Sequence, residues 1–489
     1  MVLEELKHKV MYTVIFLKKH KVKLLSMVIL MSCFWSTNLS AQVLSPAGHW
    51  KGNLEVNGQS IPLVFHIEEE SQGGWKASFD SPKQMVYEMA FDEVKIQVPS
   101  IVLKIKAAQV VYEGELQEDG SIKGNWIQGG GIFPLLLENS ADQGPKRPQT
   151  PQAPFPYDVE TVEFSNKKAG INLAGTLTLP DGQQNCPAVV LISGSGPQNR
   201  DGAILKHKPF LVLADYLTRQ GMVVLRVDDR GVGESGGTFA GATSADFATD
   251  VAAAVDYLKK HPRVNSNKVG LLGHSEGGLI APMVASSRED VAFLVLLAGP
   301  GYTGAQILKQ QNHDLTLLKT KNAQLAKKQA KALDAIYAAV LTEENQALST
   351  TEMVTLLEKD LHKLSEKDKA TLGWTEGVIR QLITQLRSPW MQYFLAANPT
   401  HYLSQVQSPV LAINGDKDLQ VHVDNLKGIE TALKKANNNQ YSIQAFENLN
   451  HLLQTSETGA IEEYVTIEET ISPKVLTAID SWLQQIGIY

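Results

Sequence analysis

The 489-residue chain has very little cysteine: only Cys33 and Cys186 occur. Cys33 lies in a segment that we interpret below as a leader, so the mature chain would keep one thiol and no intrachain disulfide. No group of cysteine and histidine has metal-ligand spacing. The sequence therefore predicts neither a disulfide framework nor a metal site, and Cys186, just before the apolar segment 187–192, is expected to be a half-buried structural thiol.

A strong excess of positive charge is also missing. The 45 Lys and Arg residues face 52 Asp and Glu residues, for a formal net charge of −7. No Lys/Arg-rich stripe occurs beyond the N-terminus, so nothing in the sequence favours nucleic-acid binding. The 43% apolar and 20% charged residues are globular values, and the length predicts two or three domains.

A run of about 20 apolar residues, as a stable membrane span requires, is missing as well. A basic cluster at 18–23 precedes an apolar run of about a dozen residues at 24–35, and small residues follow to Ala41. This pattern predicts a signal peptide over 1–41, with export to the periplasm or the medium. Two alternatives are an uncleaved anchor and a lipoprotein signal with lipidation at Cys33.

Residues 42–140 show short strands of alternating polarity, such as 61–67 and 101–106, separated by glycine-containing turns. The pattern predicts a small all-β sandwich or barrel without a catalytic constellation. Trp50 and Trp126 are expected to be core aromatics rather than a carbohydrate platform. Five prolines within 141–157 predict an extended, semi-rigid linker to the last domain, 158–489.

The stretch Gly273-His274-Ser275-Glu276-Gly277 is the most informative of the chain. A G-x-S-x-G between an apolar strand and a helix is the nucleophile elbow pattern, in which small neighbours permit a tight turn. A serine hydroxyl becomes a good nucleophile only when a base takes its proton, so a histidine and a carboxylate should follow. Asp416 and Asp418 follow a predicted strand at 409–414, and His451 follows another at 441–446.

Around these residues strands and helices alternate, as a parallel α/β sheet requires. Further strands are predicted at 159–164, 171–179, 187–192, 222–227, 268–272 and 291–297, with helices at 208–219, 244–258 and 475–483. Thr243 and Asp246 are expected to cap the helix at 244–258.

Four motifs in this order resemble the α/β-hydrolases, in the bacterial serine-aminopeptidase-like and esterase branch: 193–202, 229–235, 414–421 and 449–451. The resemblance implies a doubly wound, mostly parallel sheet and a triad of Ser275, Asp418 and His451. Its G-x-x-D pattern selects Asp418, with Asp416 holding the turn. Oxyanion donors would be the backbone N–H groups of Glu276 and of Ser195 or Gly196. Many relatives have His-Gly where this chain has Ser193-Gly194, which changes only a side-chain contact.

Between about 301 and 401 the alternation gives way to predicted helices at 306–319, 324–340, 352–364, 373–386 and 390–395. This helical segment lies directly before the predicted strand that leads to Asp418. That place favours a cap over the active site rather than a stabilising insertion far from it.

Other polar residues near the motifs have simpler interpretations. The elbow should direct the His274 side chain away from Ser275, and the Glu276 side chain should line the pocket. Arg200, Asp201, Asp229 and Arg230 are expected to form an ion-pair network under the site or, alternatively, to bind a substrate charge.

The sequence thus predicts a serine hydrolase that cleaves small-molecule carboxylic esters of short acyl chains through an acyl-enzyme, without cofactor or metal. A serine peptidase of the aminopeptidase type and a catalytically inactive binding protein are the alternatives. Substrate and oligomeric state stay open, since fold analogy does not settle them.

Overall fold

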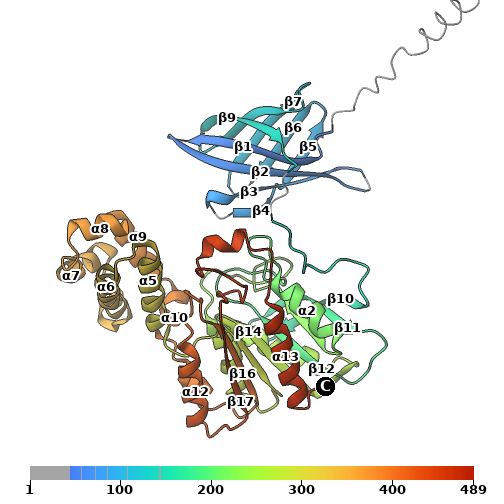
Figure 1. The fold of residues 1–489 in the computed structure, drawn as a ribbon, viewed down its shortest axis with the longest axis vertical. Coiled ribbons are helices and arrows are strands. Elements are labelled where there is room, and N and C mark those ends of the chain that lie inside the picture. Colours follow the sequence, from blue (N-terminus) through green and yellow to red (C-terminus); the bar gives the residue numbers. More distant parts are fainter. Residues whose placement is uncertain (1–44, 57, 72, 85, 107, 142–144) are drawn as a thin grey trace, which may run out of the picture. The chain divides into compact units, whose positions relative to one another are not determined.

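The computed structural model describes residues 45–489 except 57, 72, 85, 107 and 142–144. The predicted signal peptide lies outside the described residues. The chain divides into two compact units between residues 142 and 143 (Figure 1). None of the helices in the described part is long and apolar enough to cross a membrane.

The first unit is one nine-stranded antiparallel sheet in the order β4-β3-β2-β1-β9-β8-β7-β6-β5. Its elements are β1 (Gly48–Val56), β2 (Gln59–Glu69), β3 (Trp75–Ser81), the short 3₁₀ helix η1 (Pro82–Gln84), β4 (Val86–Ala90), β5 (Glu93–Gln97), β6 (Ser100–Ile105), β7 (Val110–Leu116), β8 (Ile122–Gln128) and β9 (Gly131–Asn139).

This sheet curls around a single apolar core. The Phe65 ring on β2 lies 5.1 Å from Tyr112 on β7, and Phe79 on β3 lies 5.3 Å from Trp126 on β8. Because these strands are not neighbours in the sheet, their side chains meet only if the sheet bends back on itself. Trp50 and Trp126 are buried in this core, which confirms that they are core aromatics.

The second unit contains an eight-stranded sheet in the order β10-β11-β13-β12-β14-β15-β16-β17. The pairs β10–β11 and β11–β13 are antiparallel and the others are parallel. Its elements outside the insertion are β10 (Tyr157–Asn166), β11 (Ile171–Pro180), β12 (Cys186–Ile192), α2 (Pro209–Arg219), β13 (Val223–Val227), α3 (Ser244–Leu258), β14 (Val264–His274), α4 (Gly277–Ala285), β15 (Leu294–Leu297), β16 (Val410–Gly415), α12 (Asn425–Lys435), β17 (Tyr441–Phe446), η3 (Ile461–Val465) and α13 (Pro473–Gln485).

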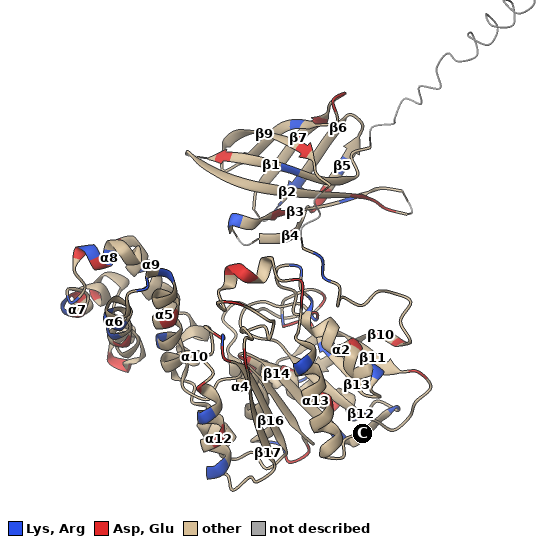
Figure 2. Ribbon diagram, viewed as in Figure 1, with Lys and Arg blue, Asp and Glu red and all other residues tan. Residues whose placement is uncertain are grey.

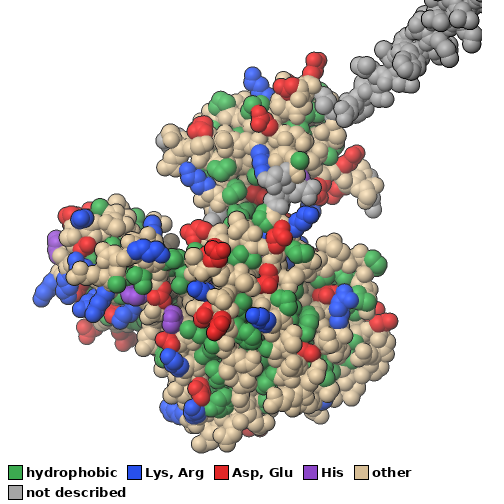
Figure 3. Space-filling model, in the orientation of Figure 1, with side chains coloured by type: hydrophobic (Ala, Val, Ile, Leu, Met, Phe, Trp, Pro, Cys, Tyr) green, Lys and Arg blue, Asp and Glu red, His purple; other side chains and the backbone are tan. Residues whose placement is uncertain are grey.

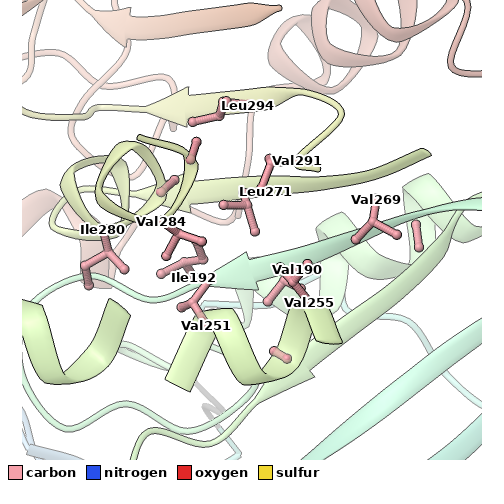
Figure 4. Packing of buried hydrophobic residues seen from close by; sticks show 14 of the residues in the cluster. Val190, Ile192, Val251, Val255, Val269, Leu271, Ile280, Val284, Val291 and Leu294 are labelled. Carbon is pink, nitrogen blue, oxygen red and sulfur yellow. The ribbon is translucent and has the colours of Figure 1, made fainter. Parts of the chain in front are cut away.

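Helices cover both faces of this sheet, since alternate residues of each strand point to opposite sides. Val190 and Ile192 of β12 pack with α3 and α4 in one apolar cluster, as Figure 4 shows. Val189 and Leu191 of the same strand pack with α2 and α13 in a second cluster. The predicted cap of α3 is confirmed: Thr243 and Asp246 form a capping box.

The insertion is a group of helices with a core of its own. They are α5 (Gly304–Thr320), α6 (Ala323–Leu341), η2 (Glu343–Ala347), α7 (Thr350–Leu361), α8 (Glu366–Leu372), α9 (Glu376–Leu386), α10 (Pro389–Ala396) and α11 (Pro399–Leu403). The predicted helix 373–386 is wrong at its start. Gly373 takes a left-handed φ of 70° and ends α8, and Thr375 caps α9, because glycine tolerates this conformation at a helix end.

Charges of both signs lie close together on the insertion (Figures 2 and 3). Lys309 of α5 pairs with Asp334 of α6 at 2.5 Å, and Lys328 of α6 pairs with Asp368 of α8 at 2.8 Å. Exposed pairs of this kind contribute little stability, so the apolar core mainly holds the insertion together.

Residues 145–156, which are part of the predicted extended linker 141–157, are tied to loops of the second unit. The Arg147 guanidinium donates to the carbonyl oxygens of Leu205, Val465 and Ile467 at 2.9–3.0 Å. Gln149 donates to the carbonyl of Ile471 at 2.8 Å. This segment therefore fastens two loops of the second unit to each other.

Candidate active site

Ser275 lies in the tight turn between β14 and α4. Its φ of 53° falls in the left-handed region, which is uncommon for residues other than glycine and stores strain. Its N–H donates to the carbonyl of Leu297 on the neighbouring strand β15 at 2.9 Å. A side chain at Gly273 would clash with the carbonyl of Gly277, and one at Gly277 with the carbonyl of Ile192. The two glycines are thus required by the turn.

Asp418 and His451 are brought together from the loops after β16 and β17. His451 Nδ1 lies 2.8 Å from Asp418 Oδ2. The other carboxylate oxygen accepts the backbone N–H groups of Gln420 and Val421, each at 2.8 Å. Asp418 is 1% exposed and His451 4%. The carboxylate is therefore fixed by the main chain and in turn fixes the imidazole, leaving its Nε2 for other partners.

Asp416, the other candidate for the acid, contacts the backbone instead of His451. Its Oδ1 accepts the backbone N–H of Asn448 at 2.6 Å and so joins the loop after β16 to the loop that carries His451. The structure puts Asp418, and not Asp416, beside the imidazole.

Ser275 and His451 line one pocket with a cavity volume of about 160 Å³. The other lining residues are Gly194, Ser195, Gln198, Gly202, Ile204, Pro209, Phe210, His274, Gln420 and Leu452. Within the described residues, Ser275 Oγ has no hydrogen-bond partner, and such bonds often tighten only when substrate binds. No group of three or more His, Cys, Asp or Glu in the described part could hold a metal ion.

The backbone N–H groups of Glu276, Ser195 and Gly196 have no acceptor among the described residues. A Cβ added at Gly194 would lie 3.2 Å from Ser275 Cβ, so the segment around Ser195 passes directly beside the serine. Ser195 lines the pocket, whereas Gly196 faces a separate cavity of about 40 Å³. The predicted oxyanion donors therefore lie in two segments that flank Ser275.

His274 is not directed away from the site, in contrast to the prediction. Its ring lies 4.9 Å from the His451 ring, and its Nε2–H donates to the His451 carbonyl oxygen at 2.9 Å. Burial lowers the His274 pKa to about 4, with the nearby His451 adding to the effect. A neutral imidazole thus packs against the predicted base. No local sequence signal indicates this placement, because it depends on the backbone path of β14.

The Glu276 side chain does not line the pocket either. It is 2% exposed and accepts hydrogen bonds from Ser244 Oγ at 2.6 Å and from the indole N–H of Trp390 at 2.9 Å. Burial raises the Glu276 pKa, while hydrogen bonds from Ser244, Trp390 and Ser195 act against this rise. Trp390 belongs to α10, so this carboxyl joins the elbow to the helical insertion.

The predicted network of charges exists with different partners. Arg200 pairs with Asp228 at 2.5 Å and with Glu234 at 2.6 Å. Asp201 pairs with Arg226, and Arg230 pairs with Asp250 at 2.7 Å. Asp229 accepts hydrogen bonds from Ser193 and Gln198 instead, and forms no ion pair with a described residue. The sequence pattern did not indicate three of these partners: Arg226 on β13, Asp228 directly after β13, and Asp250 on α3.

Several known proteins have sequences or folds similar to those of this chain. Esterase EstD of Thermotoga maritima is 25% identical over 331 residues, which cover 67% of this chain and 70% of that protein. The uncharacterized protein PA2218 of Pseudomonas aeruginosa is 32% identical over 168 residues, covering 32% of this chain and 43% of that protein. A solved structure, the Pyrococcus furiosus esterase Pf2001, matches 68% of this chain and 94% of that chain with 16% identity and a TM-score of 0.40.

The family model of serine aminopeptidase, S33, matches residues 202–458, more than half of the chain. The matched range contains Ser275, Asp418 and His451. The chain therefore belongs to the serine aminopeptidase S33 family of α/β-hydrolases and is a hydrolase.

Proposed function

We propose that this protein is a secreted serine esterase that cleaves small carboxylic esters of short acyl chains through an acyl-enzyme. The observation that carries the proposal is the meeting of three segments at one pocket: the strained turn of Ser275, the His451–Asp418 pair and the free N–H groups beside Gly194. Export rests only on the N-terminal sequence pattern.

In the proposed reaction, Ser275 Oγ attacks the ester carbonyl while His451 takes the serine proton. Asp418 holds the imidazole tautomer through Nδ1 and stabilises the imidazolium that forms. N–H groups of Glu276 and Ser195 donate to the developing oxyanion. Collapse expels the alcohol, which receives the proton from His451, and a water molecule activated by His451 then releases the acid and frees Ser275.

The lining of the pocket favours an ester over a peptide with a free amino terminus. An α-ammonium group needs an acidic partner when it is desolvated. The described residues that line the pocket include no Asp or Glu. The nonpolar side of the wall comes from Ile204, Phe210 and Leu452. A relative of this chain is named an esterase, which supports the same choice.

The cavity of about 160 Å³ favours a short acyl group. A cavity of about 150 Å³ is known to hold a molecule of the size of benzene, so a chain of many carbons would not fit without a change in the wall. The helical insertion would act as a cap, since Trp390 of α10 reaches the residue after the nucleophile.

The test is a substrate panel with purified protein. We expect p-nitrophenyl acetate and butyrate to be cleaved with a higher kcat/KM than the octanoate and laurate, and alanyl and prolyl p-nitroanilides to be cleaved far more slowly. Ser275→Ala is the control for background hydrolysis. Faster cleavage of an aminoacyl anilide than of every ester would establish the peptidase alternative, and no Ser275-dependent turnover of any substrate would favour the inactive binding protein.

A further inference from the structure

The segment Ser193–Gln198, which we call the oxyanion loop, is fastened at both ends by one side chain. Ser193 Oγ donates to Asp229 Oδ1 at 2.6 Å, and the backbone N–H of Gln198 donates to Asp229 Oδ2 at 2.9 Å. The backbone N–H of Asp229 returns a hydrogen bond to the Gln198 carbonyl at 3.1 Å. Asp229 thus bridges the first and the last residue of the loop.

The middle of this loop has few other contacts: the Gln198 side chain donates to the Ser195 carbonyl at 3.2 Å, and the Ser195 side chain hydrogen-bonds with the Glu276 carboxyl. The loop lies outside any helix or strand, and Gly196 takes a φ of 90° that other residues rarely adopt. Below the loop is the cavity of about 40 Å³, which Ser193, Gly194 and Gly196 line together with Asp229. A segment beside a cavity lacks the close packing that normally fixes a backbone, so its position depends on these few hydrogen bonds and on those that Asp229 makes at its two ends.

The charge environment of Asp229 separates it from its neighbours. Asp228 and Asp250 each pair with an arginine, whereas Asp229 has no ion pair with a described residue. The Asp229 pKa is raised to about 7, mainly by burial, with the charges of Glu276 and Asp250 acting in the same direction and the hydrogen bonds from Ser193 and Gln198 acting against it. A carboxyl kept in such surroundings costs stability, which its hydrogen bonds to the oxyanion loop only partly offset.

We propose that Asp229 is a positioning residue of the oxyanion hole: by bridging Ser193 and Gln198, it holds the N–H of Ser195 where the oxyanion forms. The inference rests on the proposed function. Asp229 does not touch the substrate, and it acts through the loop backbone. Because oxyanion donors act on the transition state more than on bound substrate, a loosened loop should lower kcat and leave KM nearly unchanged.

The variants Asp229→Ala, Asp229→Asn and Ser193→Ala test the proposal on a short-chain p-nitrophenyl ester. Complete loss of one donor costs about 100-fold or more, so we expect Asp229→Ala to lower kcat by about 10- to 100-fold with KM changed less than about twofold. Asp229→Asn can accept from Gln198 with its oxygen and donate to Ser193 with its nitrogen, so it should keep most of the activity. Ser193→Ala releases only one end of the oxyanion loop, so its kcat should lie between those of Asp229→Ala and Asp229→Asn.

Asp250→Asn is the matched control. Asp250 lines the same small cavity and pairs with Arg230, but it has no hydrogen bond to the oxyanion loop. We expect its kcat within about twofold of wild type even if its Tm falls. A trifluoromethyl ketone, which forms a tetrahedral adduct with the serine, should lose affinity in Asp229→Ala in proportion to kcat.

Three results would overturn the proposal: wild-type kcat in folded Asp229→Ala, an equal loss in Asp250→Asn, or a loss confined to KM. If Asp229→Ala does not fold, Ser193→Ala becomes the deciding variant. Wild-type kcat in Ser193→Ala would contradict the proposal that the hydrogen bonds to Asp229 hold the oxyanion loop in place. Failure of the proposed function is seen separately, as esterase activity that survives Ser275→Ala.

Discussion

On the acid–base side of the site, Asp418 accepts two backbone N–H groups and contacts His451 directly, whereas on the oxyanion side a loop crosses a cavity between two hydrogen bonds to Asp229. The first arrangement is built by the main chain at the ends of two parallel strands. The arrangement on the oxyanion side depends on the side chain of Asp229, which is not a member of the triad. Both sides meet at Ser275, whose strained turn is itself fixed by glycines on either side.

This difference indicates where substitutions will be tolerated. On the acid–base side, removal of a functional group should leave the backbone in place, since the loops after β16 and β17 are joined to each other by hydrogen bonds such as that from Asn448 to Asp416. On the oxyanion side, a substitution away from the reacting atoms should move the donors themselves. On the acid–base side, a substitution should therefore lower turnover with little change in stability. On the oxyanion side, turnover and stability should change together.

The largest effect expected is the loss of the shared nucleophile or base. Ser275→Ala and His451→Ala should each lower kcat by about a millionfold, and the double variant should be hardly worse, because triad members act as a unit. Steady-state kinetics on one activated ester measures this, with Ser287→Ala on the same part of the chain as control. Additive losses would mean that the two residues act independently.

The next effect sharpens the acid–base side. Asp418→Asn leaves a partner for His451 but favours the wrong tautomer, so kcat should fall by about 10⁴-fold. Asp416→Asn disturbs only the hydrogen bond to Asn448 and should change kcat less than about tenfold. Both variants should keep near wild-type Tm. A collapse of activity in Asp416→Asn beside an active Asp418→Asn would reverse the assignment of the acid.

Much of this side could be predicted from the sequence, because its determinants are local. The turn of Ser275 needs glycines at fixed positions, and parallel strands bring the loops with Asp418 and His451 to one edge of the sheet. The capping pair Thr243 and Asp246 is confirmed for the same reason, since it lies within one turn of helix. Where a short-range signal was overlooked, as at Gly373, the predicted helix start was wrong.

The contacts that could not be predicted join segments far apart in the chain. Trp390 reaches Glu276 across 114 residues, and Arg147 reaches Ile467 across 320. Such contacts depend on how the insertion and the 145–156 segment fold back onto the sheet, and hydrophobic periodicity carries no information on that. The interactions of Asp229 differ from the expected ion-pair network because the backbone directs Asp229 to the oxyanion loop and Arg230 to Asp250.

A third prediction concerns a residue that links the two sides. Arg147 binds the carbonyl of Leu205, beyond the oxyanion loop, and those of Val465 and Ile467, beyond His451. Arg147→Ala leaves these half-buried acceptors without their charged donor, so we expect a loss of about 2–4 kcal/mol in unfolding free energy. Urea denaturation measures it, and Arg380→Ala, which removes an exposed i,i+4 pair with Glu376, should cost less than about 1 kcal/mol. Equal losses in the two variants would show that Arg147 does not fasten the loops.

The last prediction tests the charge of the oxyanion side. Because burial raises the Asp229 pKa to about 7, the folded protein holds a proton there that the unfolded chain releases near the ordinary aspartate value of about 4. Between these values the folded state binds more protons, so the contribution of this group to stability is present at low pH and is lost as the pH rises toward 7. Asp229→Asn has no such proton, and its Tm relative to wild type should therefore increase from pH 4 to pH 7. Thermal unfolding of both proteins across this range measures the difference, with Ser287→Ala, which removes no ionisable group, as control. A constant difference would mean that Asp229 ionises as an ordinary carboxyl, while its hydrogen bonds to the oxyanion loop would still be tested by kcat.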